Sequence, residues 1–324
     1  MRAMILAAGL GTRMRPLSDL RAKPALPVRG RPVISLLLEF LSKHGFDEVL
    51  INLHHLGDSI RSAVAADHPP DVEIHWSEEP APLGTGGGIR RAADFLRGSD
   101  ACAVLAGDML LDVPLANLFE RHRSSGRHAT LLLREDERGS DFGTVGVDSE
   151  GRVIRVSETR LGTEPDHARG LFTGVRFFSR EIFGDWPSTP DPKEVAHAFE
   201  DLRDWLIPGI QDRGDSVGAE IVDASSTVWE PVGTPAEYLR VNLSPPVLPT
   251  LGRTAESWQG EIDVVGRNED VILSRKASVP ADVELERAVV WDGERVPDGF
   301  RGRDGVYAGG AFRSCADDAT GSIH

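Results

Sequence analysis

Short apolar runs alternate with amphipathic segments over the first hundred residues. Runs with the length and apolar content of buried strands occupy residues 4–8, 48–53, 72–77 and 101–108. Between them, Pro32–His44 predicts a helix that starts at a proline and is closed by Gly45, and a second helix is expected to end at Ala66. Strands that alternate with helices predict an α/β domain with a mostly parallel sheet.

From about residue 128 the pattern changes to shorter alternating runs, which indicate a more antiparallel part that carries a substrate surface. Residues 192–213 predict a helix, and the stretch that ends at residue 242 predicts a strand, a turn and a last helix. We therefore expect one domain over residues 1–242, followed by a proline-rich linker over 243–252.

Beyond the linker, small aliphatic residues recur at six-residue intervals: Val265, Val271, Ala277, Val283 and Val289. This spacing is typical of a left-handed hexapeptide β-helix in which these side chains stack inward. We expect such a segment over 253–312 and a flexible tail over 313–324; the alternative is a loose β-rich tail with an accidental period. Because five hexads make less than two coils, the segment should pack on the first domain or form a homo-oligomer.

The composition narrows the class of protein. The 324 residues include 36 Lys and Arg against 51 Asp and Glu, which gives a net charge of −15. Such an acidic chain argues against broad binding to nucleic acid or anionic membranes. The two cysteines form no metal motif or disulfide framework, and the N-terminal apolar run is too short for a signal or membrane span. A cytoplasmic protein is expected.

Polar and glycine-rich loops follow three of the predicted strands. The first contains Gly9, Gly11, Thr12 and Arg13, with Lys23 ten residues further on. The second covers residues 84–88, and Asp108 ends the fourth strand. In parallel sheets ligands bind beyond the carboxyl ends of the strands, and glycine permits close approach to the backbone. These loops favour a phosphate-rich ligand, although a short glycine loop alone is often a simple strand-to-helix turn.

The wider string is more specific. L-A-A-G-x-G-T-R-x-x-P-L and K-P-x-L-P-V, between Leu6 and Val28, resemble the signature of sugar-phosphate nucleotidylyltransferases. The G-T-x-G loop with the hexad tail is similar to that of mannose-1-phosphate guanylyltransferases, and the strings INLHHLG and LGTGGGI resemble N-acetylmuramate-1-phosphate uridylyltransferases. The resemblance covers about residues 1–242, and a hexad tail is common in that family. It implies a Rossmann-like mixed, mostly parallel sheet with helices on both faces. It also implies a reaction of NTP with a sugar 1-phosphate, assisted by Mg²⁺, that yields an NDP-sugar and pyrophosphate.

The resemblance also implies site residues. For the nucleotide these are Leu6, Ala7, Ala8, Gly9, Gly11, Thr12, Arg13, Gly84 and Thr85. For the sugar they are Gly143, Glu158 and Gly174, and for catalysis Arg13, Lys23 and Asp108, the last as the metal ligand. Phosphoryl chemistry gathers negative charge, so it needs positioning and neutralisation by cations more than proton transfer. The alternatives are a solvated surface lysine for Lys23 and a helix-capping role for Asp108.

Three motifs depart from the family pattern. Thr159 and Arg160 follow Glu158 where lysine is common, and F-T-G-V around Gly174 lacks the usual amide. Pro231 replaces the second metal-binding aspartate of W-x-D-V-G-T-P, while Glu230 would point to the opposite face of a strand. Either a bend redirects Glu230, or Asp108 holds the metal with phosphates and water, or activity is reduced.

These departures leave the substrate open. GTP with mannose 1-phosphate is the leading expectation. UTP with N-acetylmuramate or hexose 1-phosphate is the alternative, and a regulatory paralogue that binds NDP-sugar without turnover is a further one. The adjacent His54 and His55 would face opposite ways on a strand, which argues against a shared metal ion.

Overall fold

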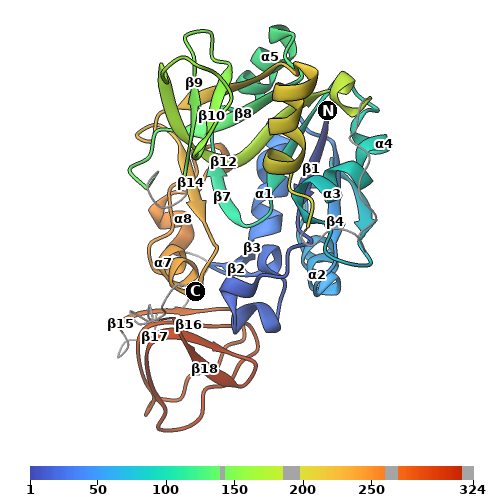
Figure 1. The fold of residues 1–324 in the computed structure, drawn as a ribbon. Coiled ribbons are helices and arrows are strands. Elements are labelled where there is room, and N and C mark those ends of the chain that lie inside the picture. The colour runs from blue at the N-terminus through green and yellow to red at the C-terminus, as the bar shows by residue number, and fades with distance from the viewer. Residues whose placement is uncertain (139–142, 185–197, 260–268, 316–324) are drawn as a thin grey trace.

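The computed structural model of the chain describes residues 1–138, 143–184, 198–259 and 269–315. A large α/β domain carries a smaller β domain at one end (Figure 1). We call this smaller domain, which contains the strands between Glu269 and Ser314, the tail. Within the described residues, no helix is both long and apolar enough to cross a membrane.

The described part of the large domain is built on a ten-stranded mixed sheet. One half is parallel, in the order β5 (Glu73–Glu78), β4 (Glu48–Leu53), β1 (Arg2–Leu6) and β6 (Ala101–Ala106). The long β12 (Ala168–Ser179) runs antiparallel to β6 and begins the other half. That half contains β8 (Ala129–Arg134), β9 (Thr144–Val147), β10 (Val153–Val156), β11 (Thr159–Arg160) and β13 (Val217–Val222). The expected change from parallel to antiparallel pairing is confirmed.

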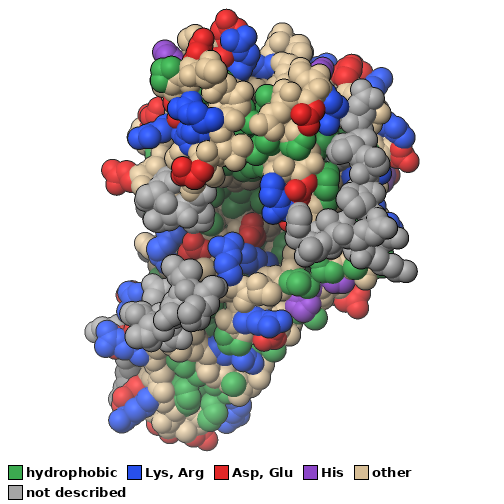
Figure 2. Space-filling model, viewed as in Figure 1, with side chains coloured by type: hydrophobic (Ala, Val, Ile, Leu, Met, Phe, Trp, Pro, Cys, Tyr) green, Lys and Arg blue, Asp and Glu red, His purple; other side chains and the backbone are tan. Residues whose placement is uncertain are grey.

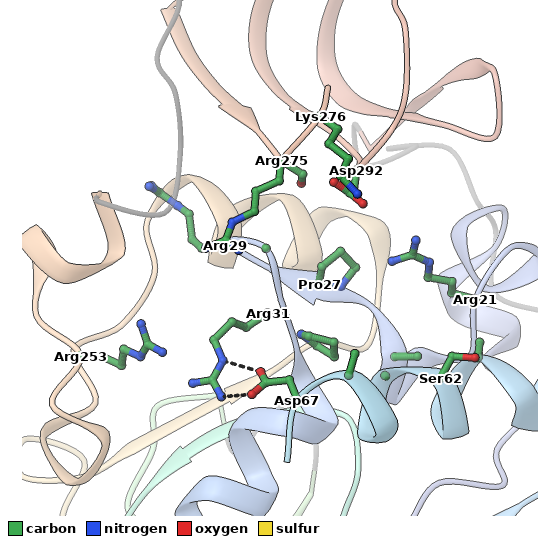
Figure 3. Close-up of a pocket in the computed structure, with 17 residues that line it drawn as sticks. Arg21, Pro27, Arg29, Arg31, Ser62, Asp67, Arg253, Arg275, Lys276 and Asp292 are labelled. Atoms are coloured by element: carbon green, nitrogen blue, oxygen red, sulfur yellow. Dashed lines mark hydrogen bonds and ion pairs between the residues drawn. The ribbon is translucent and has the colours of Figure 1, made fainter. Parts of the chain in front are cut away.

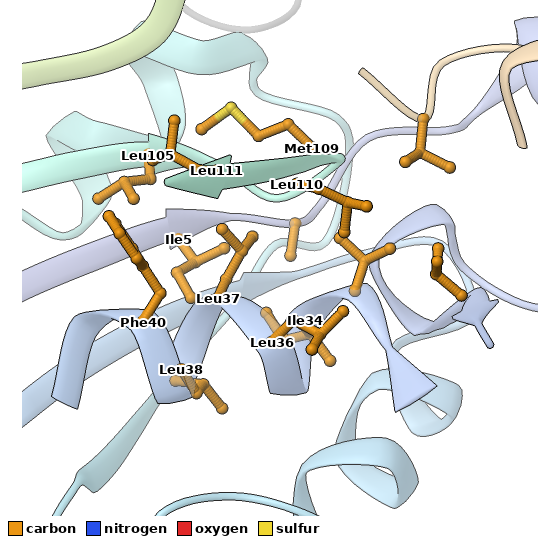
Figure 4. Packing of buried hydrophobic residues seen from close by; sticks show 14 of the residues in the cluster. Ile5, Ile34, Leu36, Leu37, Leu38, Phe40, Leu105, Met109, Leu110 and Leu111 are labelled. Carbon is orange, nitrogen blue, oxygen red and sulfur yellow. The ribbon is translucent and has the colours of Figure 1, made fainter. Parts of the chain in front are cut away.

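Helices cover both faces of the sheet, as expected, because alternate strand residues point to opposite sides. Ala3 and Ile5 belong to a core shared with α1 (Val33–Lys43), α2 (Gly57–Ala66) and α5 (Leu115–Ser125). Figure 4 shows Leu37 and Phe40 of α1 packed against Ile5 and Leu105 of the sheet. Met4 instead joins a core with α3 (Gly84–Arg91), α4 (Ala93–Leu96) and Trp205.

Three predicted elements differ in extent. The first strand spans Arg2–Leu6 rather than 4–8, so Ala7 and Ala8 already belong to the loop. The second glycine loop is itself helical from Gly84 onward. Of the predicted helix 192–213, residues 192–197 lie outside the described residues, while Asp201–Leu206 and Gly209–Arg213 form π-helical turns.

The loops at the carboxyl edge are short helical turns and small strands. They include the 3₁₀ turns η1 (Thr12–Met14), η2 (Leu17–Asp19) and η3 (Lys23–Ala25), with β2 (Pro27–Val28) paired to β3 (Arg31–Pro32). The turn η4 (Arg180–Phe183) follows β12 at the opposite edge, where Ser179 pairs with Ala101. Antiparallel strands β7 (Met109–Asp112) and β14 (Val228–Pro231) form a separate ribbon that leads into α7 (Pro235–Leu243).

The connection after α7 is packed against the large domain. It contains η7 (Pro249–Leu251) and α8 (Ala255–Gln259). The backbone N–H and hydroxyl of Thr250 each donate to the Asp112 carboxylate, at 2.8 Å, and Trp258 is fully buried. These contacts hold the segment in place where the sequence predicts a linker.

The tail contains β15 (Glu269–Leu273), β16 (Glu284–Val290), β17 (Arg301–Ala308) and β18 (Ala311–Ser314), of which the first three are parallel. Glu269 pairs with Glu286, and Glu284 with Arg301, so successive strands are offset by 17 residues and not by three hexads. The β-helix-like architecture is consistent with the prediction; its handedness stays a prediction.

The offset of 17 residues changes which side chains face inward. Val271 and Val283 do lie in the tail's own core, with Ala277 packed at its edge. Val289 does not: the prediction is wrong there, because Val289 faces the large domain while its neighbour Val290 fills the coil. Val265 lies outside the described residues.

The tail docks on its own chain. Ile272, Val289, Trp291, Val306 and Ala308 join the core of the large domain. The indole N–H of Trp291 donates to the Tyr238 hydroxyl at 2.9 Å, and that hydroxyl donates to the Pro27 carbonyl at 2.7 Å. Of the predicted flexible tail, Arg313 and Ser314 belong to β18 and Cys315 is buried, while 316–324 lie outside the described residues. A homo-oligomer through the tail remains a prediction.

Candidate active site

The first glycine loop leaves β1 after Leu6 and turns through η1. Ala7 and Ala8 are buried, whereas Gly9, Thr12 and Arg13 are exposed. Gly11 has a φ of +63°, the left-handed region that favours glycine, and its carbonyl accepts from the Ser18 hydroxyl at 2.7 Å. A side chain at Gly9 would meet no atom within 4 Å, so open space lies above the loop.

A buried amide joins this loop to the second one. The Ala7 N–H donates to Asn52 Oδ1 at 2.7 Å, and Asn52 Nδ2 donates to Glu79 Oε1 at 2.6 Å. The other Glu79 oxygen accepts from the Leu83 N–H at 3.3 Å, and burial raises the pKa of Glu79. The sequence analysis missed both residues; the signal was an asparagine inside the apolar strand 48–53.

The second glycine loop packs on a segment far away in sequence. A side chain at Gly84 would come within 2.5 Å of the Phe199 carbonyl oxygen, and one at Gly86 within 2.6 Å of the Phe199 ring. The Thr85 hydroxyl lies 2.7 Å from Glu200 Oε2 and 2.6 Å from Asp201 Oδ1. Its side chain is therefore engaged with the protein, so the predicted nucleotide contact depends on the loop backbone.

An ion pair with both side chains buried lies behind this loop. Arg176 Nε is 2.7 Å from Asp201 Oδ2, and Arg176 Nη1 donates to the Gly174 carbonyl at 3.0 Å. Removing one partner of such a pair leaves an uncompensated buried charge. The pair thus links Gly174, a predicted sugar contact, to the segment that holds Thr85.

The three predicted catalytic residues come together at the carboxyl edge of the sheet. Lys23 Nζ lies 2.8 Å from Asp108 Oδ2, with the Lys23 side chain 11% exposed and that of Asp108 36% exposed. A β-carbon at Gly233 would lie 3.8 Å from Lys23 Nζ and 3.9 Å from Arg13 Nη2. The Val232 N–H donates to the Asp108 carbonyl at 2.8 Å and so anchors this turn.

Figure 2 shows a hollow in the large domain with charged side chains at its rim and apolar ones deeper inside. Of the three predicted catalytic residues, Arg13 and Asp108 line a cavity in this domain, and Lys23 adjoins it through Asp108. The cavity measures about 180 Å³, and its lining includes Arg13, Asp108, Gly174, Pro231 and Glu237. Gly174, with a φ of +83°, is the predicted sugar residue that lines it. Gly143, with a φ of +77°, and Glu158, exposed in the turn between β10 and β11, are not part of this lining.

Glu237 is a third residue that the sequence analysis missed. Its carboxylate accepts from the N–H groups of Gly233 at 2.7 Å and Thr234 at 2.9 Å, and the Thr234 hydroxyl accepts in return from the Glu237 N–H. This reciprocal arrangement is a capping box, whose signal is the T-x-x-E spacing at the start of α7. It holds the Gly233 turn beside Lys23.

Glu230 does not turn toward Asp108. Its Oε2 accepts from Arg240 Nη2 at 2.6 Å and lies 3.5 Å from Arg138 Nη1. Pro231 lines the cavity but has no side-chain ligand. Of the three alternatives for the metal, the redirected Glu230 is therefore disfavoured by the geometry.

The donor set still fits Mg²⁺. The described residues contain no group of three or more His, Cys, Asp or Glu side chains that could hold a metal ion. Mg²⁺ usually keeps several waters and binds through one or two carboxylates together with substrate phosphates. Asp108, half-buried and beside the cations, matches that requirement as one carboxylate.

The two histidines hold the loops. His54 Nδ1 lies 2.9 Å from the Glu79 carbonyl oxygen, and His55 Nε2 lies 2.9 Å from that of Ser18. Each ring thus contacts the backbone of a loop that borders the site. His54 contacts the segment before the second glycine loop, and His55 contacts the segment after the first.

Comparison with known proteins identifies the family. Residues 2–244 match the family described as Nucleotidyl transferase. The mannose-1-phosphate guanylyltransferase of Mycobacterium tuberculosis is 31% identical over 311 residues, which cover 92% of this chain and 81% of the relative. The UTP–glucose-1-phosphate uridylyltransferase of Synechocystis is 31% identical over 250 residues, 74% of this chain but only 61% of the relative.

Two further matches bear on substrate and fold. The N-acetylmuramate alpha-1-phosphate uridylyltransferase of Neisseria meningitidis is 36% identical over 185 residues, 56% of this chain and 77% of the relative. The crystal structure of HddC from Yersinia pseudotuberculosis complexed with GMP-PN has a TM-score of 0.59 at 23% identity, covering 74% of this chain and 97% of that one. This likeness concerns the fold. The chain belongs to the nucleotidyl transferase family, the sugar-phosphate nucleotidylyltransferases.

Proposed function

We propose that this chain transfers a nucleotidyl group from an NTP to a sugar 1-phosphate and releases pyrophosphate. The observation that carries the proposal is that Arg13 and Asp108 line one hollow beside the glycine loop, while Lys23 pairs with Asp108 at 2.8 Å. These residues lie on different elements, and a loop with open space above Gly9 adjoins them.

The chemistry requires neutralisation of charge. A phosphate oxygen of the sugar 1-phosphate attacks the α-phosphorus, the bond from that phosphorus to the bridging oxygen breaks, and pyrophosphate leaves with the electron pair. Arg13 can donate two hydrogen bonds to phosphate oxygens, and Lys23 supplies a compact charge. Asp108 would hold Mg²⁺, which would supply further charge neutralisation to the phosphates. The Asn52 and Glu237 contacts keep the two loops in position for this step.

GTP with mannose 1-phosphate is the substrate pair we favour. The relative named as a mannose-1-phosphate guanylyltransferase aligns along 92% of this chain, tail included. UTP with N-acetylmuramate 1-phosphate or a hexose 1-phosphate is the alternative, supported by the two uridylyltransferase relatives. The acidic composition and two free, buried cysteines support a cytoplasmic location.

A non-catalytic protein that binds NDP-sugar is the second candidate. Pro231 removes one carboxylate from the cavity, and the Glu230 carboxylate is engaged by Arg240 and Arg138. Of the two carboxylates in the lining, Glu237 is held by backbone N–H groups, so Asp108 alone is left to hold a metal ion. Such a cavity could retain ligand binding while it loses turnover.

Pyrophosphate release distinguishes the candidates. The purified chain is assayed with Mg²⁺ and each common NTP against mannose, glucose and N-acetylmuramate 1-phosphates. We expect the highest kcat/KM for GTP with mannose 1-phosphate. A higher value for a UTP pair contradicts the substrate assignment but keeps the reaction. No release from any pair, together with calorimetric binding of an NDP-sugar, would establish the non-catalytic function.

A further inference from the structure

A second and larger cavity lies between the large domain and the tail. It measures about 790 Å³ and shares no lining residue with the cavity around Asp108. In Figure 3, Arg275, Lys276 and Asp292 enter it from the tail, while Arg21 and Arg31 enter from the large domain. The space therefore exists because the tail docks on this chain.

Positive charge predominates in this cavity. Six lining residues are cationic: Arg21, Arg29, Arg31, Arg253, Arg275 and Lys276. The acidic lining residues are Asp67 and Asp292. Elsewhere acidic residues prevail, since the whole chain carries a net charge of −15. Gathering like charges costs electrostatic energy, which a bound anion would offset.

Only part of this charge is neutralised by the protein. Arg31 Nε lies 2.8 Å from Asp67 Oδ2, and its Nη1 lies 2.5 Å from a Glu39 oxygen. Arg275 and Lys276 are exposed and form no ion pair within the described part of the chain. The guanidinium of Arg21 lies 4.8 Å above the Trp291 ring, a contact that orients the side chain but leaves its charge uncompensated.

Arg29 is buried in the wall of the cavity. Its guanidinium donates to the backbone carbonyls of Asn242 and, at 2.9 Å, of Leu243. Burial lowers the pKa of Arg29, an effect that the charge of Asp270 opposes. Neutral carbonyls orient this cation without cancelling its charge, so it adds to the positive potential of the cavity.

We propose that this cavity binds a small anion with two or more phosphate groups. Arginine forks match phosphate oxygens in bidentate geometry, and several are placed here on two sides of one space. The volume is in the range of about 300–1,000 Å³ that is typical of small-molecule sites and exceeds the need of one orthophosphate. The proposal does not depend on the function proposed above.

Calorimetric titration of the full chain with tripolyphosphate tests the proposal. Because the catalytic hollow also attracts phosphates, we expect two classes of site. The double variant Arg275→Ala with Lys276→Ala should weaken one class at least ~10-fold, since each charge-assisted contact accounts for roughly such a factor. Arg13→Ala should weaken only the other class.

A matched control removes two charges from the same tail. Arg295 and Arg301 are exposed and lie outside the cavity lining, so Arg295→Ala with Arg301→Ala should leave both classes unchanged. Equal affinity and stoichiometry in the two double variants would overturn the proposal, as would loss of all binding in Arg13→Ala. Repeating the titration with glucose 1,6-bisphosphate distinguishes the sources: tighter binding indicates a phosphorylated metabolite, and weaker binding indicates free polyphosphate.

Discussion

The hollow proposed as the catalytic site and the basic cavity are both lined by cationic side chains, but they balance charge differently. In the hollow, Lys23 faces Asp108 at 2.8 Å, and Glu237 is held by backbone N–H groups. In the basic cavity, Arg275 and Lys276 have no carboxylate within ion-pair distance among the described residues. Opposite charges side by side allow a metal ion and a phosphate to be placed next to each other. An excess of like charge provides binding alone.

The largest contrast is expected from removing a carboxylate in each region. Asp108→Asn should lower kcat at least ~1,000-fold, because the charge that would hold the metal is lost. Asp292→Asn, a matched change in the basic cavity, should leave kcat within about two-fold of the unmodified chain, as expected for a surface change away from the reacting groups. Steady-state pyrophosphate release checks both. Equal effects of the two changes on kcat would contradict the assignment of the reaction to the hollow around Asp108 and not to the basic cavity.

Arg13→Ala should lower kcat at least ~100-fold, since one preorganised charge contact in the transition state is worth a few kcal/mol. Arg15, two residues away, is exposed and pairs with Asp19 at 3.2 Å, so Arg15→Ala serves as the control. Near-normal turnover of a folded Arg13→Ala protein would remove Arg13 from the mechanism.

Lowering the pH should destabilise the fold through a buried histidine, His122, that lines neither cavity. His122 is 1% exposed, and burial lowers its pKa from 6.5 to about 4. Below pH 6.5 His122 is protonated in the unfolded chain but stays neutral in the folded chain until the pH reaches its folded pKa of about 4. The free energy of unfolding therefore falls as the pH is lowered between these two values. Between pH 7 and 5 the free energy of unfolding should drop by about 2 kcal/mol from this group.

Urea unfolding at both pH values measures that drop. His122→Gln removes the titrating group, so its stability should depend less on pH over this window, whatever its absolute stability. An unchanged pH dependence in the variant would show that other groups cause the loss.

The smallest effect is expected from restoring the missing carboxylate. Pro231→Asp should tighten the apparent Mg²⁺ affinity several-fold, because it adds a second carboxylate that can coordinate the ion beside Asp108. The rate measured against Mg²⁺ concentration gives that affinity. Glu230→Gln is the control, because its carboxylate is paired with Arg240 and should not affect the metal. An inactive Glu230→Gln with an unaltered Pro231→Asp would make Glu230 the ligand.

The sequence by itself determined the class of fold and most of the elements that we propose bind phosphate. Strand runs of period two and amphipathic helices encode which face each residue buries, and this information is local. Glycine at position 11 and the T-x-x-E of α7 likewise act within a few residues. Such features can be predicted because their physical cause lies in neighbouring positions.

Only the tertiary structure decided which charges meet. Lys23 and Asp108 are separated by 85 positions, and Asn52 reaches both glycine loops from a third strand. The pairing of Glu230 with Arg240, the orientation of Val289 and the basic cavity all depend on how separate elements pack. The offset of 17 residues between tail strands turned Val289 outward onto the large domain, and that docking supplies one wall of the cavity. Side chains distant in sequence come together only when burial of apolar surface sets the positions of the elements that carry them.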